Sequence, residues 1–125
     1  MSEAVHRELG AGRWWSLTLA EQLGNIGSEV SRTLKWRSRD ARIAQGAMER
    51  ALELIELTLD DPRHRASAAR LRELCRMREV LLDYLVGPNQ YGSTGNSLQR
   101  YFDVFAAAAT RRPRDVRGEE SAPPR

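Results

Sequence analysis

Hydrophobic residues recur every three or four positions in four segments of the chain, which is the spacing of a helix with one buried face. No segment alternates between apolar and polar residues as a half-buried β-strand does. The first segment starts at Thr18, which stands three residues before Glu21, the spacing of a capping box. Its apolar positions then run from Leu19 to Leu34. We therefore expect a first helix that begins at residues 16–18.

The second and third segments meet at a strong start signal for a helix. The second is expected to begin after Ser38 or Asp40 and to end at Asp60. Asp61 and Pro62 follow directly. An aspartate can accept hydrogen bonds from the unpaired amides of a first turn, and a proline at the first helical position loses no hydrogen bond. The sequence therefore predicts that the third helix starts at residue 62.

Gly87 and Pro88 end the third helix, and the loop that follows leads to a fourth, with its apolar face between residues 98 and 109. Short connections place successive helices antiparallel. The expected fold is all-α, an antiparallel up-down four-helix bundle. The expected domain limits are a flexible leader at 1–13, the bundle at 14–110, and a disordered, proline-containing tail at 111–125.

A line of small residues follows the first helix beside its apolar face. Two glycines within it weaken the helix, which suggests that another backbone packs closely there. Aromatic residues also exceed what one four-helix core needs to bury, namely Trp14, Trp15, Trp36 and Tyr91. The chain is therefore predicted to form a homo-oligomer, with an interface that includes Ala20, Gly24, Gly27, Ser28 and Ser31.

Candidate chemistry is sparse. The single cysteine, Cys75, lies in an apolar helical segment and is expected to be buried, which fits a reducing, cytoplasmic compartment. His6 and His64 are too far apart to form a zinc site with it, and no glycine-rich loop lies between a strand and a helix. No apolar run is long enough to span a membrane. The chain is predicted to be neither an enzyme nor a membrane protein, with no metal and no cofactor.

Positive charge is the remaining signal. The formal net charge is +3, and lysine occurs only at position 35 among the 20 basic residues. Arginine forks suit phosphate groups, and an aromatic ring among cations can stack on a base. The predicted nucleic-acid surface, for RNA or DNA, combines a cluster around the first helix end with three arginines of the third helix: Arg32, Lys35, Trp36, Arg37, Arg39, Arg42, Arg65, Arg72 and Arg76.

An acidic stripe on the second helix leaves two other interpretations open. Antiparallel packing would place it beside the arginines of the third helix, so that ion pairs within the chain could neutralise them. The arginines could instead bind an acidic protein partner. The stripe consists of Glu49, Glu53, Glu56 and Asp60.

The segments SLTLAEQLGNIGSEVSR, RLRELCRMREVLLDYL and YGSTGNSLQRYF resemble small bacterial helical proteins. In size, helix order and arginine-rich surface the chain also resembles the four-helix-bundle family of ribosomal-RNA intervening-sequence proteins and accessory proteins of diversity-generating retroelements. That resemblance implies a barrel-like homopentamer that binds nucleic acid and a reverse transcriptase, with no catalytic residues. No family motif maps onto individual residues of this chain.

The resulting functional prediction is a non-enzymatic accessory protein of a bacterial retroelement, which binds RNA or DNA and a reverse-transcriptase-type partner. The alternative is a helical protein–protein interaction module with no nucleic-acid binding.

Overall fold

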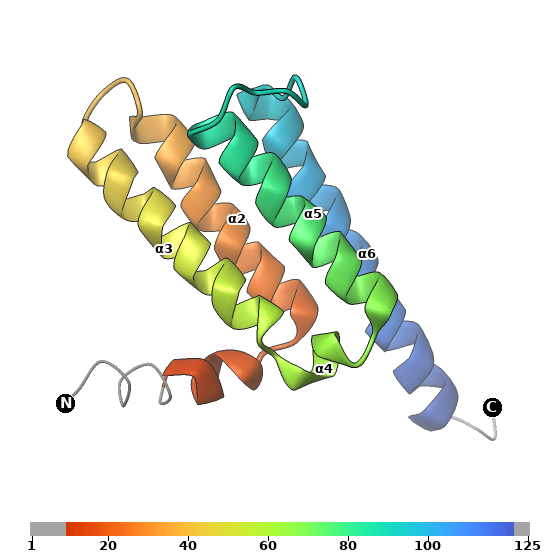
Figure 1. The fold of residues 1–125 in the computed structure, drawn as a ribbon. Helices are drawn as coiled ribbons and strands as arrows, with labels where there is room; N and C mark the ends of the chain where they lie inside the picture. Colours follow the sequence, from red (N-terminus) through yellow and green to blue (C-terminus); the bar gives the residue numbers. More distant parts are fainter. Residues whose placement is uncertain (1–9, 122–125) are drawn as a thin grey trace.

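The computed structural model describes the backbone of residues 10–121 and the side chains of residues 10–108. This part of the chain contains helices and no strand, so the all-α class is confirmed (Figure 1). The expected count of four helices is wrong, because the described residues form six. A helical segment at residues 10–15 precedes five further helices: α2 (Leu19–Trp36), α3 (Ala41–Leu59), α4 (Pro62–Arg65), α5 (Ala68–Leu85) and α6 (Gly95–Ser121).

The start of α2 confirms the capping box. The Thr18 hydroxyl accepts a hydrogen bond from the backbone amide of Glu21, and the Glu21 carboxylate accepts one from the amide of Thr18. Each side chain thereby satisfies a backbone donor that the first turn leaves unpaired. The apolar stripe that follows is buried, and its fully enclosed members are Leu23, Ile26 and Val30.

The region after α3 differs from the expected single third helix. Asp61 caps α4 as predicted, since its side chain accepts a hydrogen bond from the amide of Arg63. That helix is only four residues long. Ser67 then accepts a hydrogen bond from the amide of Arg70 and caps α5. The second cap divides the predicted helix in two and turns the chain between α4 and α5.

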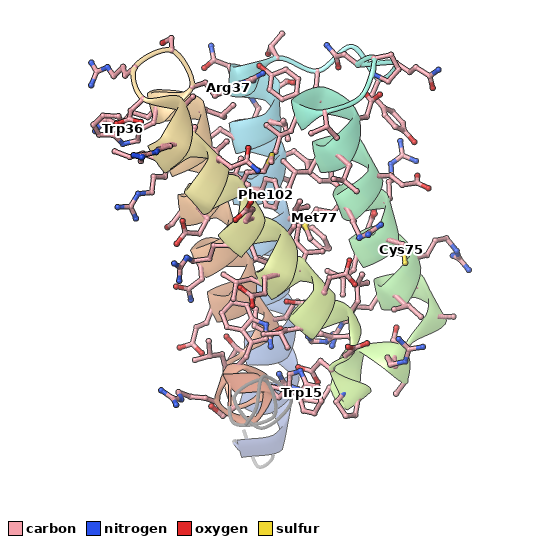
Figure 2. All side chains as sticks on the ribbon, turned by 60° about the vertical axis from the view of Figure 1, so that its left-hand side comes forward. Trp15, Trp36, Arg37, Cys75, Met77 and Phe102 are labelled. Atoms are coloured by element: carbon pink, nitrogen blue, oxygen red, sulfur yellow. The ribbon has the colours of Figure 1, made fainter. Side chains whose placement is uncertain are left out.

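The core lies along α2, which packs against α3 on one side and α6 on the other, while α5 packs on α3 and α4. Figure 1 shows the chain reversing direction between α2 and α3 and again between α5 and α6. Met77 of α5 and Phe102 of α6 point into the space between the helices (Figure 2). Ile43, in the first turn of α3, is 38% exposed.

The first described helical segment corrects the expected leader at 1–13, since residues 10–13 are helical and residues 1–9 lie outside the described part of the chain. This segment also explains where two of the tryptophans, Trp14 and Trp15, are used. The Trp14 indole donates a hydrogen bond to the hydroxyl of Thr58, and that of Trp15 donates one to the carbonyl of Leu57. Both rings pack on the core of their own chain, so neither supports the predicted oligomer interface.

Helix α6 runs past the expected domain limit at residue 110 and continues to Ser121 (Figure 1). Residues 111–121, expected to belong to a disordered tail, therefore have a helical backbone, while their side chains and residues 122–125 lie outside the described part. None of the helices in the described residues has the length and apolar character that a membrane crossing requires.

Candidate functional site

The turn between α2 and α3 gathers five cations at one end of the molecule. The chain reverses there because the amides of Arg39 and Asp40 both donate to the carbonyl of Trp36, 3.0 and 2.9 Å away. The Asp40 carboxylate is engaged locally, since it accepts hydrogen bonds from the first amides of α3. We call this region the cationic end, and it consists of Arg32, Lys35, Arg37, Arg39 and Arg42 around Trp36.

Aromatic rings accompany these cations. The Lys35 ammonium and the Arg39 guanidinium lie 6.0 and 5.8 Å from the centre of the Trp36 ring. The Arg37 guanidinium lies 5.1 Å from the ring centre of Tyr84, which belongs to α5. Figure 2 shows Trp36 and Arg37 at the same end of the molecule, opposite the end that carries Trp15. These distances are typical of attraction between a cation and an aromatic face.

The acidic stripe does not neutralise the predicted cations. Within the described residues its one ion pair joins Glu56 to Arg78, with 2.5 Å between Oε2 and Nε, and Arg78 is not among the predicted residues. The other ion pair of an α3 residue joins Arg50 to Glu29 of α2 at 3.9 Å. In the part of the chain that the structure describes, the cationic end forms no ion pair, so its charge is available to an external anion.

The three arginines of the predicted third helix lie elsewhere. Arg65 is on α4, at the opposite end of the molecule from the cationic end, and donates a hydrogen bond to the carbonyl of Leu59. Arg72 and Arg76 lie on α5, where the Arg76 guanidinium stands 5.8 Å from the ring centre of Tyr91. The nine predicted residues therefore do not form one surface: six lie at the cationic end, Arg72 and Arg76 lie on α5, and Arg65 lies on α4.

Arg72 and Arg76 line a groove of about 860 Å³ beside α5 that reaches Phe105 of α6 and Leu19 of α2. Cys75 is exposed and also lines this groove, so its predicted burial is wrong. It follows the buried Leu74 by one position, and the two side chains point about 100° apart around the helix, so that of Cys75 points away from the core (Figure 2).

A buried hydroxyl, that of Tyr101, lies on α6 near Arg76. Tyr101 has no hydrogen-bond partner for its hydroxyl among the described residues. Burial raises the pKa of this hydroxyl, and the charge of Glu73 raises it further against the opposing effect of Arg76.

Val104, on the exposed side of α6, is 62% exposed.

The small-residue line of α2 is used partly within the chain. A Cβ atom on Gly27 would lie 3.6 Å from Cβ of Phe102, so α6 packs closely at that glycine. Gly24 has open space around it, and Ser28 and Ser31 are exposed. Ala20 is half-buried against the core. The close approach expected from the glycines is therefore found at one of them, and the predicted interface between copies stays a prediction.

A buried polar cluster at the α4 end was missed in the sequence. It joins the segment at residues 10–15 to α2, α4 and α5 through groups that are distant in sequence. The Gln22 amide donates to the Trp14 carbonyl at 3.0 Å and to the Asp61 carboxylate at 3.1 Å. Its amide oxygen lies 2.7 Å from Nε2 of His64, and Nδ1 of His64 lies 3.3 Å from Nη1 of Arg70.

These hydrogen-bond partners determine which ring nitrogen of His64 carries the proton. Because the Gln22 nitrogen donates to two acceptors, its oxygen must accept from Nε2–H of His64, which leaves Nδ1 to accept from Arg70. Burial lowers the pKa of His64, and the nearby charges of Arg70 and Arg63 lower it further against the opposing effect of Asp61. His64 is therefore a neutral structural residue, 1% exposed.

The carboxylate of Asp61 is the charged centre of this cluster. Burial by itself would raise its pKa, but hydrogen bonds from the Arg63 side chain, from Gln22 and from the Arg63 amide outweigh burial and lower the pKa to about 2. The shortest of these joins Nη2 of Arg63 to Oδ2 at 2.6 Å. Among the described residues no group of three His, Cys, Asp or Glu side chains is placed to hold a metal ion.

No family model, no curated protein and no solved structure matches this chain. What the fold and the site define is therefore an all-α protein with a cationic end and a separate groove beside α5.

Proposed function

We propose that the protein is a non-enzymatic accessory protein that binds nucleic acid, RNA or DNA, through its cationic end. The observation that carries this proposal is the set of five cations around Trp36, which form no ion pair in the described residues. Exposed arginines with no carboxylate partner can contact phosphates, and each contact releases condensed counterions.

Several finer features belong to the same proposal. The long helices α2, α3, α5 and α6 act as an up-down four-helix unit, and copies of this unit assemble into a cytoplasmic homo-oligomer, a pentamer by the family resemblance. The second partner is a reverse-transcriptase-type protein of a bacterial retroelement. The groove beside α5 supports a protein partner, because it combines the apolar Phe105 with Arg72 and Arg76.

The experiment compares two double variants of equal charge change. Arg39→Ala with Arg42→Ala removes two cations of the cationic end, and neither side chain forms a hydrogen bond or an ion pair in the described residues. Arg13→Ala with Arg50→Ala removes two exposed cations from elsewhere on the molecule. Binding to labelled RNA and DNA is measured by fluorescence anisotropy over a series of salt concentrations.

The first variant is expected to weaken binding to unrelated sequences equally, because phosphates carry no base information. It should also reduce the slope of log K against log salt by about 1.4 on single strands and about 1.8 on duplex DNA, the contribution of two contacts. The Arg13 and Arg50 variant should keep the parent slope. Equal effects of the two variants, or no binding at about 50 mM salt, where phosphate contacts are strong, would contradict the proposal.

A second candidate function is a helical protein-interaction module that binds no nucleic acid. The groove beside α5, which Phe105 lines, and the exposed Val104 elsewhere on α6 favour it, since exposed apolar surface is common at protein interfaces. The same binding series separates the two candidates, because only the first requires salt-dependent affinity for RNA or DNA.

A further inference from the structure

Trp36 differs from the other two tryptophans in its surroundings. Trp14 and Trp15 pack on the core and donate their indole N–H groups to partners in α3. Trp36 is half-buried, is not packed against the core cluster, and its indole makes no hydrogen bond in the described residues. Packing of its own chain therefore does not account for this large ring at the cationic end.

The cations next to Trp36 favour the binding of a second flat aromatic ring, such as a nucleobase. Lys35 and Arg39 lie near its ring, and Arg37 lies over Tyr84, so three of the five cations of the cationic end stand beside aromatic faces. The charged groups of Lys35 and Arg39 lie over the Trp36 ring, where a stacked base would replace them, and these long side chains can then contact the phosphates on either side of that base. Base stacking and phosphate contacts can occur together only where an accessible base face and its neighbouring phosphates lie at the same place.

A nucleic-acid duplex cannot provide base stacking and phosphate contacts together at this site. Its bases are stacked on one another inside the helix, so a protein surface meets phosphates and base edges rather than base faces. The cationic end is the turn between two helices at the end of the molecule (Figure 1), and the described pocket nearest to it is lined by Arg37 but not by Trp36. An unpaired base can reach the exposed part of the Trp36 ring, whereas a paired base cannot.

We infer that the cationic end selects single-stranded over duplex nucleic acid by stacking an unpaired base on Trp36. This inference rests on the proposed function and names the substrate class of that same site. Lys35 and Arg39 position the strand by its phosphates, and Trp36 supplies the preference for unpaired bases.

The test measures the affinity of the full chain for two probes at one salt concentration. One is an unstructured oligonucleotide of about 15 nucleotides, the scale of single-strand site sizes, and the other is a blunt duplex of the same length. The parent protein should bind the single strand at least about fivefold more tightly, the lower end of what one stacked base contributes.

Two variants isolate the ring. Trp36→Leu keeps an apolar side chain without an aromatic face and should weaken single-strand binding by roughly 5- to 100-fold while changing duplex binding less than about twofold. Trp36→Phe keeps an aromatic face and should recover much of the single-strand affinity. Because Trp36 lies outside the core cluster, both variants should melt within a few degrees of the parent.

The outcomes are distinct. Loss of single-strand affinity in Trp36→Leu with recovery in Trp36→Phe supports the inference. Equal affinity of the parent for both probes, or equal weakening of both by Trp36→Leu, overturns the inference and leaves the phosphate-binding proposal standing. No binding of the parent to either probe overturns both.

Discussion

The buried carboxylate of Asp61 offers the sharpest test of the structure. It accepts hydrogen bonds from the side chain and amide of Arg63 and from Gln22, which lower its pKa from the ordinary value of 3.8 to about 2. A folded-state pKa below the unfolded value means that the carboxylate stabilises the fold fully above pH 3.8. This stabilisation is lost as the pH falls toward 2.

The size of the effect follows from the same change in pKa. At about 1.4 kcal/mol per pKa unit, lowering the pKa from 3.8 to about 2 corresponds to about 2 to 3 kcal/mol of folding free energy, of which about 1 kcal/mol is lost by pH 3. Asp61→Asn removes the charge and sets an amide donor against the donors of Arg63 and Gln22. At neutral pH we expect it to cost about 2 to 3 kcal/mol, the range of hydrogen bonds to a charged group.

The neighbouring Asp60 provides the control, because Asp60→Asn makes the same charge change on an exposed side chain. It should alter stability by less than about 0.5 kcal/mol. The assay is urea unfolding followed by circular dichroism at neutral pH and near pH 3. If Asp61→Asn unfolds at the same urea concentration as Asp60→Asn, or loses as much stability in acid as the parent, Asp61 is not the buried acceptor described above.

Three further predictions concern the rest of the molecule. Gly24→Ala should raise the free energy of unfolding by up to about 1 kcal/mol, because nothing lies near its Cβ position. Gly27→Leu should lower the free energy of unfolding by about 1 to 3 kcal/mol, because the larger side chain would crowd Phe102. Thermal melting of the two variants distinguishes these outcomes. Since the pKa of buried His64 is lowered, stability should fall as the pH drops below about 6.5, and His64→Gln should flatten that slope in urea titrations between neutral and mildly acidic pH. Light scattering should give a mass above that of the 14.2 kDa chain, and a monomer mass would contradict the proposed oligomer.

Local signals in the sequence predicted much of the helical structure. Thr18 and Glu21 marked the start of α2, and Asp61 with Pro62 marked the start of α4, because capping depends only on residues within one turn. The division of the third helix was missed although Ser67 carries a cap signal of its own. The apolar positions of this helix begin only at residue 71, after the boundary at residues 66–67, so their period could not reveal where the chain turns.

The candidate site was predictable only in part. The residues of the cationic end are neighbours in sequence, so the turn between two helices was enough to bring them together. Arg65, Arg72 and Arg76 were added from charge alone, and the structure places them away from that turn. The buried polar cluster gave no sequence signal, because Gln22, His64 and Arg70 belong to different helices and become partners only after folding.

The two ends of the molecule should respond to salt in different ways, which determines what a binding experiment can establish. The Asp61 carboxylate lies in the interior, although its partner Arg63 is exposed, and ions screen such a partly buried pair weakly, so added salt should leave the hydrogen bonds of Asp61 in place. The cationic end is exposed, and its attraction to phosphates falls steeply as salt rises. A loss of nucleic-acid binding in salt that leaves the melting temperature unchanged therefore reports phosphate contacts, whereas a parallel loss of both would show that the fold itself depends on exposed charges.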